Sequence, residues 1–418
     1  MNAKQPVQRR RLKYAATIND EALGEETDAD YELQYVDIGN VDSSGAIHEI
    51  APYRFADAPS RARRRVRDGD VIISCVRTYL QAIAPIQSPP DNLIVSTGFA
   101  VVRPRAGVLD PAFGKYALRE PRFLAEVEMR SVGVSYPAIN ASDLADIAVH
   151  LPPSSQQPAI ADYLDRETAR LDALVAAKER VLGLLAEKRR ALITRAVTRG
   201  LDPRAPLRDS GISWLGEIPA HWKTERAKWL FSERDERSTL GEETLLSLRM
   251  ERGLVPHNEV SEKQTCPDEL VGYKRTSTGE VVVNRMRAAI GLIAVTPQAG
   301  VVSPDYAVFI PSTGADVRYY VYLFTTELLG AVFRSVSTGM GTGSSGFLRL
   351  YSESFQELWL PYPPLAEQRR IVDFIARETG KLAEMRAAIE RTISLIKERR
   401  AALIAAAVAG HVDVGADA

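Results

Sequence analysis

Arginine side chains are the residues of this sequence best suited to chemistry with an anionic or base-edge partner. Five of them fall within seven positions, at Arg61, Arg63, Arg64, Arg65 and Arg67. A guanidinium presents a planar fork of donors that matches the acceptors of phosphates and base edges. The whole chain has 53 Lys and Arg against 54 Asp and Glu, a net charge of −1. A polyanion would therefore have to bind a local patch of positive charge, because the chain as a whole is nearly neutral. Taken alone, the arginine run is equally well interpreted as a solvated loop.

Further hydrogen-bond donors follow expected strands or lie in the loops after expected helices. Arg77 and Tyr79 come just past a strand, and Arg285 and Arg287 occupy the corresponding stretch of the second half. Donors placed in this way could read base edges in a nucleic-acid groove, although packing or solvation is the ordinary alternative for any one of them. The candidate nucleic-acid contacts are Arg61, Arg63, Arg64, Arg65, Arg67, Arg77, Tyr79, Tyr136, Asn140, Arg249, Arg285, Arg287, Ser344, Ser345 and Arg349.

The residue inventory does not indicate a catalytic centre. The five histidines are too far apart in sequence for a local metal motif. No lysine has Asp or Glu two positions before it, so half of a common metal-dependent nuclease motif is absent, and no phosphate-binding Gly-Lys loop occurs. The string from Gly341 to Gly346 fits G-x-G-x-x-G, but it follows a helical stretch, whereas a dinucleotide fingerprint follows a strand. We expect no catalytic residue, no metal and no cofactor in this chain.

An internal duplication determines the expected architecture. Residues 157–197 and 368–408 align at a constant offset of 211, and 19 of the 41 paired positions are identical. The similarity continues upstream more weakly, where Arg77 falls opposite Arg287. Each half is therefore a divergent module followed by a similar segment, which is typical of a repeated structural unit.

The two similar segments have the pattern of long helices. Each begins after a Pro-Pro pair and ends at a glycine, Gly200 or Gly410. Apolar residues recur with heptad spacing, which predicts a coiled-coil seam between two antiparallel helices, each a rod on the order of 60 Å long. Lys178 interrupts the first seam. The expected seam residues are Leu164, Leu171, Leu174, Leu182, Leu185 and Leu192 in the first helix, and Ile375, Leu382, Met385, Ile389, Ile393, Ile396 and Leu403 in the second.

The divergent modules have a mixed α/β pattern. The first predicts strands at 70–76, 83–86 and 94–103 and a helix at 111–129, and the second repeats this order at 280–285, 291–295, 302–311 and 316–334. We therefore expect an α+β fold in which two α/β recognition modules are joined by two long antiparallel coiled-coil helices with pseudo-twofold symmetry. The expected boundaries are 1–152 and 202–362 for the modules, and 153–201 and 363–413 for the helices.

The composition favours a reducing compartment. The only cysteines are Cys75 and Cys266, which cannot form a disulfide framework. The longest apolar run, at 401–409, is too short to span a bilayer, and no apolar signal segment follows the basic start of the chain. We expect a cytoplasmic protein with no membrane partner.

In combination, several of these motifs resemble the specificity subunits of Type I restriction-modification systems. They are Gln156-Gln157 and Glu367-Gln368, the two Arg-Glu-Thr triplets, the repeated Lys/Arg-Arg-x-Ala-Leu-Ile, and the phrase 209–219 followed by His221-Trp222. The resemblance covers essentially the whole chain. The first module departs from it by lacking the Trp-Leu-Gly-Glu-Ile-Pro lead-in, and Gln156 stands where the second copy has Glu367.

The resemblance implies a non-catalytic subunit in which each module binds one half of an asymmetric, interrupted sequence of double-stranded DNA. It further implies that the helices space the modules and carry two methylation subunits, and that restriction/translocase subunits join them. S-adenosylmethionine, ATP and Mg would then belong to the partner subunits. The sharing of phosphate contacts among subunits would account for the near-neutral charge of this chain.

Two other classes of protein remain open. Coiled-coil helices carrying two adaptable modules are also suited to a protein-binding scaffold that contacts no nucleic acid. A methyltransferase in its own right is disfavoured because its motifs are missing. Retention of random DNA duplexes, with a steep salt dependence, would distinguish the DNA-binding subunit from the scaffold.

Overall fold

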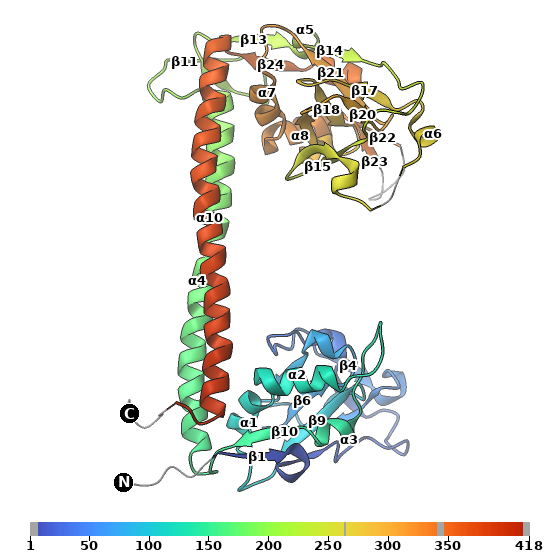
Figure 1. Cartoon of the computed structure of the whole chain (residues 1–418), viewed down its shortest axis with the longest axis vertical. Coiled ribbons are helices and arrows are strands. Elements are labelled where there is room, and N and C mark those ends of the chain that lie inside the picture. Colours follow the sequence, from blue (N-terminus) through green and yellow to red (C-terminus); the bar gives the residue numbers. More distant parts are fainter. Residues whose placement is uncertain (1–6, 263–264, 341–346, 413–418) are drawn as a thin grey trace. The chain divides into compact units, whose positions relative to one another are not determined.

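The structure, a computed structural model, describes residues 7–262, 265–340 and 347–412, and the chain divides into two units (Figure 1). Unit 1 comprises Met1–Glu179 and Glu390–Ala418, and unit 2 comprises Arg180–Ile389. The chain has two long helices, α4 (Gln157–Arg199) and α10 (Leu365–Val408). Each of them has one part in unit 1 and the other part in unit 2. Each unit therefore contains one α/β module and segments of both helices.

The module of unit 1 is built on two four-stranded sheets. The first has the order β2-β9-β6-β7, and all its pairings are antiparallel. The second has the order β4-β3-β8-β5, with β3 and β8 parallel. The strands are β2 (Ala16–Ile18), β3 (Glu32–Val36), β4 (Ala51–Arg54), β5 (Ala62–Arg65), β6 (Val71–Ser74), β7 (Ile83–Pro85), β8 (Leu93–Ser96) and β9 (Phe99–Pro104).

Three helices and a two-stranded ribbon complete this module. The helices are α1 (Pro111–Ala117), α2 (Pro121–Met129) and α3 (Ala141–Ala145), and the ribbon pairs β1 (Gln8–Arg11) with β10 (Ala148–Leu151). Strand β6 is buried on both faces because its Val-Ile-Ile sequence lies between two apolar clusters. This strand fixes the loop that follows it, which carries Arg77.

Unit 2 repeats this order of elements. Its four-stranded antiparallel sheet has the order β14-β21-β18-β19, the counterpart of β2-β9-β6-β7. The main elements are β14 (Phe231–Arg234), β15 (Leu246–Arg249), β16 (Gly253–Pro256), β17 (Lys274–Thr276), β18 (Val281–Asn284), β19 (Ile293–Val295), β20 (Gly300–Val302), β21 (Tyr306–Pro311), α7 (Val317–Phe324), α8 (Glu327–Val336) and α9 (Ser352–Gln356). Shorter elements are β11 (Leu207–Asp209), β12 (Glu217–Pro219), β13 (Lys223–Arg226), α5 (Ala227–Leu230), α6 (Pro267–Leu270), β22 (Thr338–Met340), β23 (Phe347–Arg349) and β24 (Trp359–Tyr362).

Two types of boundary differ from the sequence prediction. The helix expected at 111–129 is two helices, because Pro121 occupies the first turn of α2 and the side chain of Glu120 caps the start of that helix. The helix expected at 316–334 is also two helices, since Thr326 caps the start of α8. The strand expected at 94–103 is also two strands, since Thr97 and Gly98 form a turn between β8 and β9.

A buried glutamine joins each module to its long helix. Gln157 accepts a hydrogen bond from the backbone N–H of Asp110 at 2.7 Å and donates to the carbonyls of Val108 and Pro152, both at 2.9 Å. Gln368 makes the same three bonds in unit 2, with Asp316, Gly314 and Pro363. Both glutamines are completely buried, so these bonds fix where each module sits on the helix it precedes.

The two long helices are antiparallel within each unit. In unit 1, Leu164 of α4 shares a core with Ile404 of α10, and Asp172 of α4 lies 2.9 Å from Arg400. In unit 2, Ile193 and Val197 of α4 share a core with Ile371 and Ile375 of α10. The expected pairing of antiparallel coiled-coil helices is thereby confirmed (Figure 1).

Most of the expected seam residues are buried or partly buried, with two exceptions. Leu174 and Met385 are 44% and 56% exposed. After Leu171, the next inward position comes four residues later rather than three, at the partly buried Val175. The prediction was therefore wrong for this pair, which occupies equivalent sites in the two helices. Within the described residues, no helix is both long and apolar enough to cross a membrane.

Candidate nucleic-acid interface

The loop after β6 brings together three of the residues singled out from the sequence. The backbone N–H of Arg77 donates to the carbonyl of Pro137 at 2.8 Å, and this contact joins the loop to the segment that follows α2. The guanidinium carbon of Arg77 lies 4.8 Å from the ring centroid of Tyr136. Tyr79, 54% exposed, belongs to the 3-10 turn Thr78–Leu80 that Arg77 precedes. Arg77 and Tyr136 therefore lie together at this exposed loop, and Tyr79 is exposed two residues after Arg77.

Arg77 is held in an unusual backbone conformation. Its φ is 53°, in the left-handed region, and Gln81 at the other end of the 3-10 turn has φ 51°. Non-glycine residues adopt this region at a cost of about 1 kcal/mol or more. The Pro137 contact and a hydrogen bond of 2.7 Å between the hydroxyls of Thr78 and Ser131 stabilise the turn. The side chain of Arg77 therefore projects from a fixed loop.

The same two segments also carry exposed apolar side chains, which the sequence prediction missed. Val134, in the segment after α2, is fully exposed, and Val132, Met129 and Leu80 are also exposed. A group of exposed apolar side chains of this kind is typical of an interaction surface. The available signal was the alternation of valine with glycine and serine at 131–136, which is apolar for a solvated loop.

Unit 2 has an equivalent loop after β18. Arg287 is exposed and precedes the 3-10 turn Ala288–Ile290, as Arg77 precedes its own turn. The backbone N–H of Leu350 donates to the carbonyl of Arg285 at 2.9 Å, which corresponds to the bond of 3.0 Å from Ile139 to Cys75 in unit 1. The antiparallel pair β22–β23 thus takes the position of the segment after α2. Arg77 and Arg287 occupy equivalent positions in the two modules.

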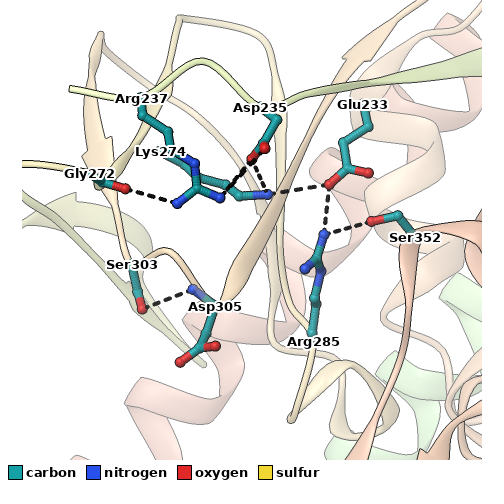
Figure 2. A network of polar contacts seen from close by, with 9 residues as sticks. All are labelled: Glu233, Asp235, Arg237, Gly272, Lys274, Arg285, Ser303, Asp305 and Ser352. Atoms are coloured by element: carbon teal, nitrogen blue, oxygen red, sulfur yellow. Dashed lines mark hydrogen bonds and ion pairs between the residues drawn. The ribbon is translucent and has the colours of Figure 1, made fainter. Parts of the chain in front are cut away.

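Arg285 has a different environment from the one expected of a base-edge reader. Its Nη2 lies 2.7 Å from Glu233 Oε1 and 2.7 Å from Ser352 Oγ, and its side chain is only 15% exposed (Figure 2). These contacts hold the guanidinium inside the module and brace α9 against β14. Nη2 is therefore committed to partners that are remote in sequence, and a contact of Arg285 with a base edge stays a prediction.

The carboxylate of Glu233 belongs to a wider charged network. It lies 3.3 Å from the ammonium of Lys274, which is 2% exposed and is also 2.9 Å from Asp235 (Figure 2). Hydrogen bonding to Lys274 lowers the pKa of Asp235. The network compensates the burial of the lysine and the arginine, since a buried charge without a partner would be strongly destabilising.

Three arginines of the run in unit 1, Arg63, Arg64 and Arg65, lie in strand β5 rather than in a loop. Strand β5 pairs with β8 in its sheet, with a register shift between Ala62 and Arg64, and its other edge makes backbone hydrogen bonds to residues 21–23. The guanidinium of Arg63 lies over the ring of Phe55 at 4.5 Å, and that of Arg65 lies over Tyr31 at 5.9 Å. Arg67 pairs with Glu21. Arg61 and Arg67 are exposed, whereas Arg63, Arg64 and Arg65 are partly buried.

The remaining candidates have mixed environments. Asn140 caps α3, because its side-chain oxygen accepts the N–H of Asp143 at 2.8 Å. Arg249 is exposed at the end of β15. Arg349 pairs with Asp305 at 3.2 Å and lies 5.7 Å from the ring centroid of Tyr351. Ser344 and Ser345, like the whole string from Gly341 to Gly346, lie outside the described residues.

The titratable groups do not form a metal centre within the part of the chain that the structure describes, where no cluster of three or more His, Cys, Asp or Glu has metal-binding geometry. His48, His221 and His257 each contact a different neighbour, respectively Asp42, Glu367 and Ser247. Burial raises the pKa of the Cys75 thiol to about 11, which leaves it protonated and weakly nucleophilic at neutral pH.

Comparison with known proteins places this architecture in a class. The family model of the Type I restriction modification DNA specificity domain matches residues 271–391. A putative type I restriction enzyme MjaX specificity subunit from Methanocaldococcus jannaschii is 23% identical over 167 residues, 39% of this chain and 37% of the relative. The HindI specificity subunit from Haemophilus influenzae is 24% identical over 133 residues, 31% of this chain and 28% of the relative. These matches span about a third of the curated relatives' length.

Solved structures resemble the chain over nearly its full length. One is a chain from a structural study of complex assembly and conformational transition in the type I R-M system. It is 22% identical, with a TM-score of 0.73, and the aligned region covers 99% of this chain and 100% of that chain. The HsdS subunit from Thermoanaerobacter tengcongensis has a TM-score of 0.56 at 22% identity, with 97% of both chains covered. These structures show that the chain has the fold of the HsdS subunit and of the type I R-M system chain. Within that fold, residues 271–391 are similar in sequence to the Type I restriction modification DNA specificity domain.

Proposed function

We propose that this chain is the DNA-binding specificity subunit of a Type I restriction-modification complex, and that it recognises a bipartite, asymmetric site in double-stranded DNA. One observation carries the proposal: two modules of the same fold present an exposed arginine, Arg77 or Arg287, at equivalent positions next to a 3-10 turn. The residues around the two arginines differ, so the two modules read different half-sites.

The recognition chemistry follows from the exposed loop of unit 1. Arg77 lies over the ring of Tyr136, which orients the guanidinium and leaves its edge donors free to face an acceptor pair such as guanine O6 and N7. The exposed Val134 beside it is suited to an apolar contact, such as the methyl group of thymine. In unit 2, Arg287 supplies the corresponding fork of donors.

The remaining chemistry belongs to partner subunits. We assign methylation to two methylation subunits that bind S-adenosylmethionine, and cleavage to restriction/translocase subunits that use ATP and Mg. The chain itself is non-catalytic and acts in the cytoplasm. Support comes from the similarity of residues 271–391 to the Type I specificity domain and from relatives that are themselves named as specificity subunits.

Exchange of one module tests the proposal. Residues 1–151 are replaced by the first module of another family member, and the chain is co-expressed with its methylation subunit. Methylated sites are then mapped by sequencing the host DNA. We expect one half-site to change while the other half-site remains the same, because each half-site contacts its own module.

The parent chain and the reciprocal exchange of the second module serve as controls. A change in both half-sites would show that the modules do not read DNA independently. If mobility-shift assays with the methylation subunit present revealed neither sequence preference nor salt dependence, the protein-binding scaffold would be the better description.

A further inference from the structure

A cavity lies in unit 1 where the module meets the long helix. Its volume is about 540 Å³, and the wall formed by α10 consists of Arg400, Ala401 and Ile404. Lys115 and Arg119, at the end of α1 and in the turn after it, form the opposite wall. Arg400 and Ile404 belong to the repeated Arg-Arg-x-Ala-Leu-Ile motif, for which the function proposed above provides no role.

Unit 2 contains a cavity at the equivalent place. Its volume is about 790 Å³, and α4 lines it with Arg189, Arg190 and Ile193. Arg189 and Ile193 are the repeat counterparts of Arg400 and Ile404, at the same offset of 211 residues. The opposite wall includes Thr325, which ends α7. The duplication has therefore preserved a concave surface in which arginine from the long helix faces the module.

The cavity of unit 1 contains a cation that no carboxylate neutralises. Of the three cations that line it, Lys115 pairs with Asp165 at 2.6 Å and Arg400 with Asp172 at 2.9 Å. Within the part of the chain that the structure describes, Arg119 pairs with no carboxylate and donates to the backbone carbonyls of Ser43, at 2.7 Å, and Ser44. Burial lowers the pKa of Arg119, and the like charge of Arg400 lowers it further. An anion bound between these groups would relieve both effects.

Each cavity also adjoins the exposed arginine loop. Gln81, the residue that ends the 3-10 turn after Arg77, lines the cavity of unit 1. Gly291, which ends the turn after Arg287, lines the cavity of unit 2. Four residues of 3-10 turn span roughly 8 Å. A duplex that places a base edge at Arg77 or Arg287 therefore has backbone phosphates within reach of the adjacent cavity.

We propose that each cavity is a binding site for a backbone phosphate of the target DNA, formed by Arg119 and Arg400 in unit 1 and by Arg189 in unit 2. This assignment rests on the proposed DNA-binding function and deepens it: the loops read sequence, and the cavities hold the backbone. The repeated arginine motif of the long helices thereby contributes affinity that is independent of sequence.

The salt dependence of binding tests the assignment. Arg119→Gln and Arg400→Gln are each prepared in the full chain, assembled with the methylation subunit, and titrated with a duplex carrying the recognised site and with a duplex altered at one base pair. Loss of one phosphate contact reduces the slope of log affinity against log salt by about 0.9, equivalent to roughly eightfold in affinity at 0.1 M salt. We expect both duplexes to lose affinity equally, so that their ratio is unchanged.

Arg399→Gln is the matched control. Arg399 precedes Arg400 on α10, is exposed, and does not line the cavity, so its removal leaves the slope at the wild-type value. Thermal melting of each variant checks that the fold is intact. Wild-type slopes for both Arg119→Gln and Arg400→Gln would overturn the phosphate site.

Two further outcomes separate this site from the proposed function. Failure of the Arg400→Gln chain, but not the Arg399→Gln chain, to retain the methylation subunit would identify the cavity as a protein-docking surface and also overturn the phosphate site. If the wild-type complex binds all duplexes equally while the variant slopes fall as expected, the phosphate site stands and sequence recognition by this chain fails.

Discussion

Replacement of Arg77 tests whether the loop after β6 reads a base or only holds the backbone. Tyr136 covers one face of the guanidinium at 4.8 Å, which leaves the edge donors for a single bidentate contact. One such contact discriminates against a wrong base by about 1 to 3 kcal/mol, or roughly 5- to 150-fold. Arg77→Ala in the assembled complex should therefore abolish the preference at one base pair of one half-site.

Arg77→Lys makes this test more specific. Lysine keeps the charge but lacks the planar fork, so a base reader loses discrimination with either substitution, whereas a phosphate contact is largely retained with lysine. Tyr136→Ala should have a smaller effect, about 0.5 to 1 kcal/mol, because it removes only the stacking that orients the arginine. Both residues are exposed, and the N–H of residue 77 still bonds to Pro137, so the free energy of unfolding should change little.

The assay is competition binding against a panel of duplexes, each altered at one base pair of the recognised site. Arg287→Ala provides the matched control, since it should relax the other half-site instead. An equal loss of affinity for every duplex in the panel, with discrimination intact, would refute the assignment of Arg77 as a base reader.

Two further predictions concern stability. Gln157→Ala should lower the free energy of unfolding, measured by urea titration, by about 2 to 4 kcal/mol, because three buried backbone groups lose their hydrogen-bond partner. Gln368→Ala should have the same effect in unit 2. A loss below about 1 kcal/mol would contradict the role of these glutamines. Leu164→Ala should lower the free energy of unfolding by about 2 to 5 kcal/mol, because Leu164 is fully buried. Leu174→Ala should lower it by less than about 1 kcal/mol, because Leu174 is 44% exposed. Equal losses for the two variants would show that Leu174 belongs to the seam after all.

Repetition made the long helices and their pairing predictable from the sequence. Two copies of one heptad pattern within a chain indicate both the helices and an intramolecular partner. The spacing of three or four between inward positions was harder to infer, because Leu174 and Met385 are apolar although they lie off the seam. The helical pattern at 111–129 does not by itself show the break between α1 and α2, where Pro121 begins a new helix.

The candidate interface could be predicted where the order of neighbouring residues along the chain was enough. Arg77 follows a buried strand, and its proximity to Tyr136 could be anticipated only in part, because the contact depends on how the segment after α2 folds back. The environment of Arg285 could not be inferred from its neighbours, since Glu233 and Ser352 come from distant parts of the chain. The exposed valines at 132 and 134 carry no side-chain hydrogen-bond donor, so a pattern of donors does not indicate them.

The buried glutamines have a consequence for the exchange of modules. The hydrogen bonds that Gln157 and Gln368 make to their modules go to main-chain atoms, so these bonds do not depend on the module side chains. A foreign module that follows the same backbone course at the start of the long helix keeps these three hydrogen bonds. Its apolar side chains must still pack against Ile160 and Leu164 of α4, so the core at the joint limits which modules can be exchanged.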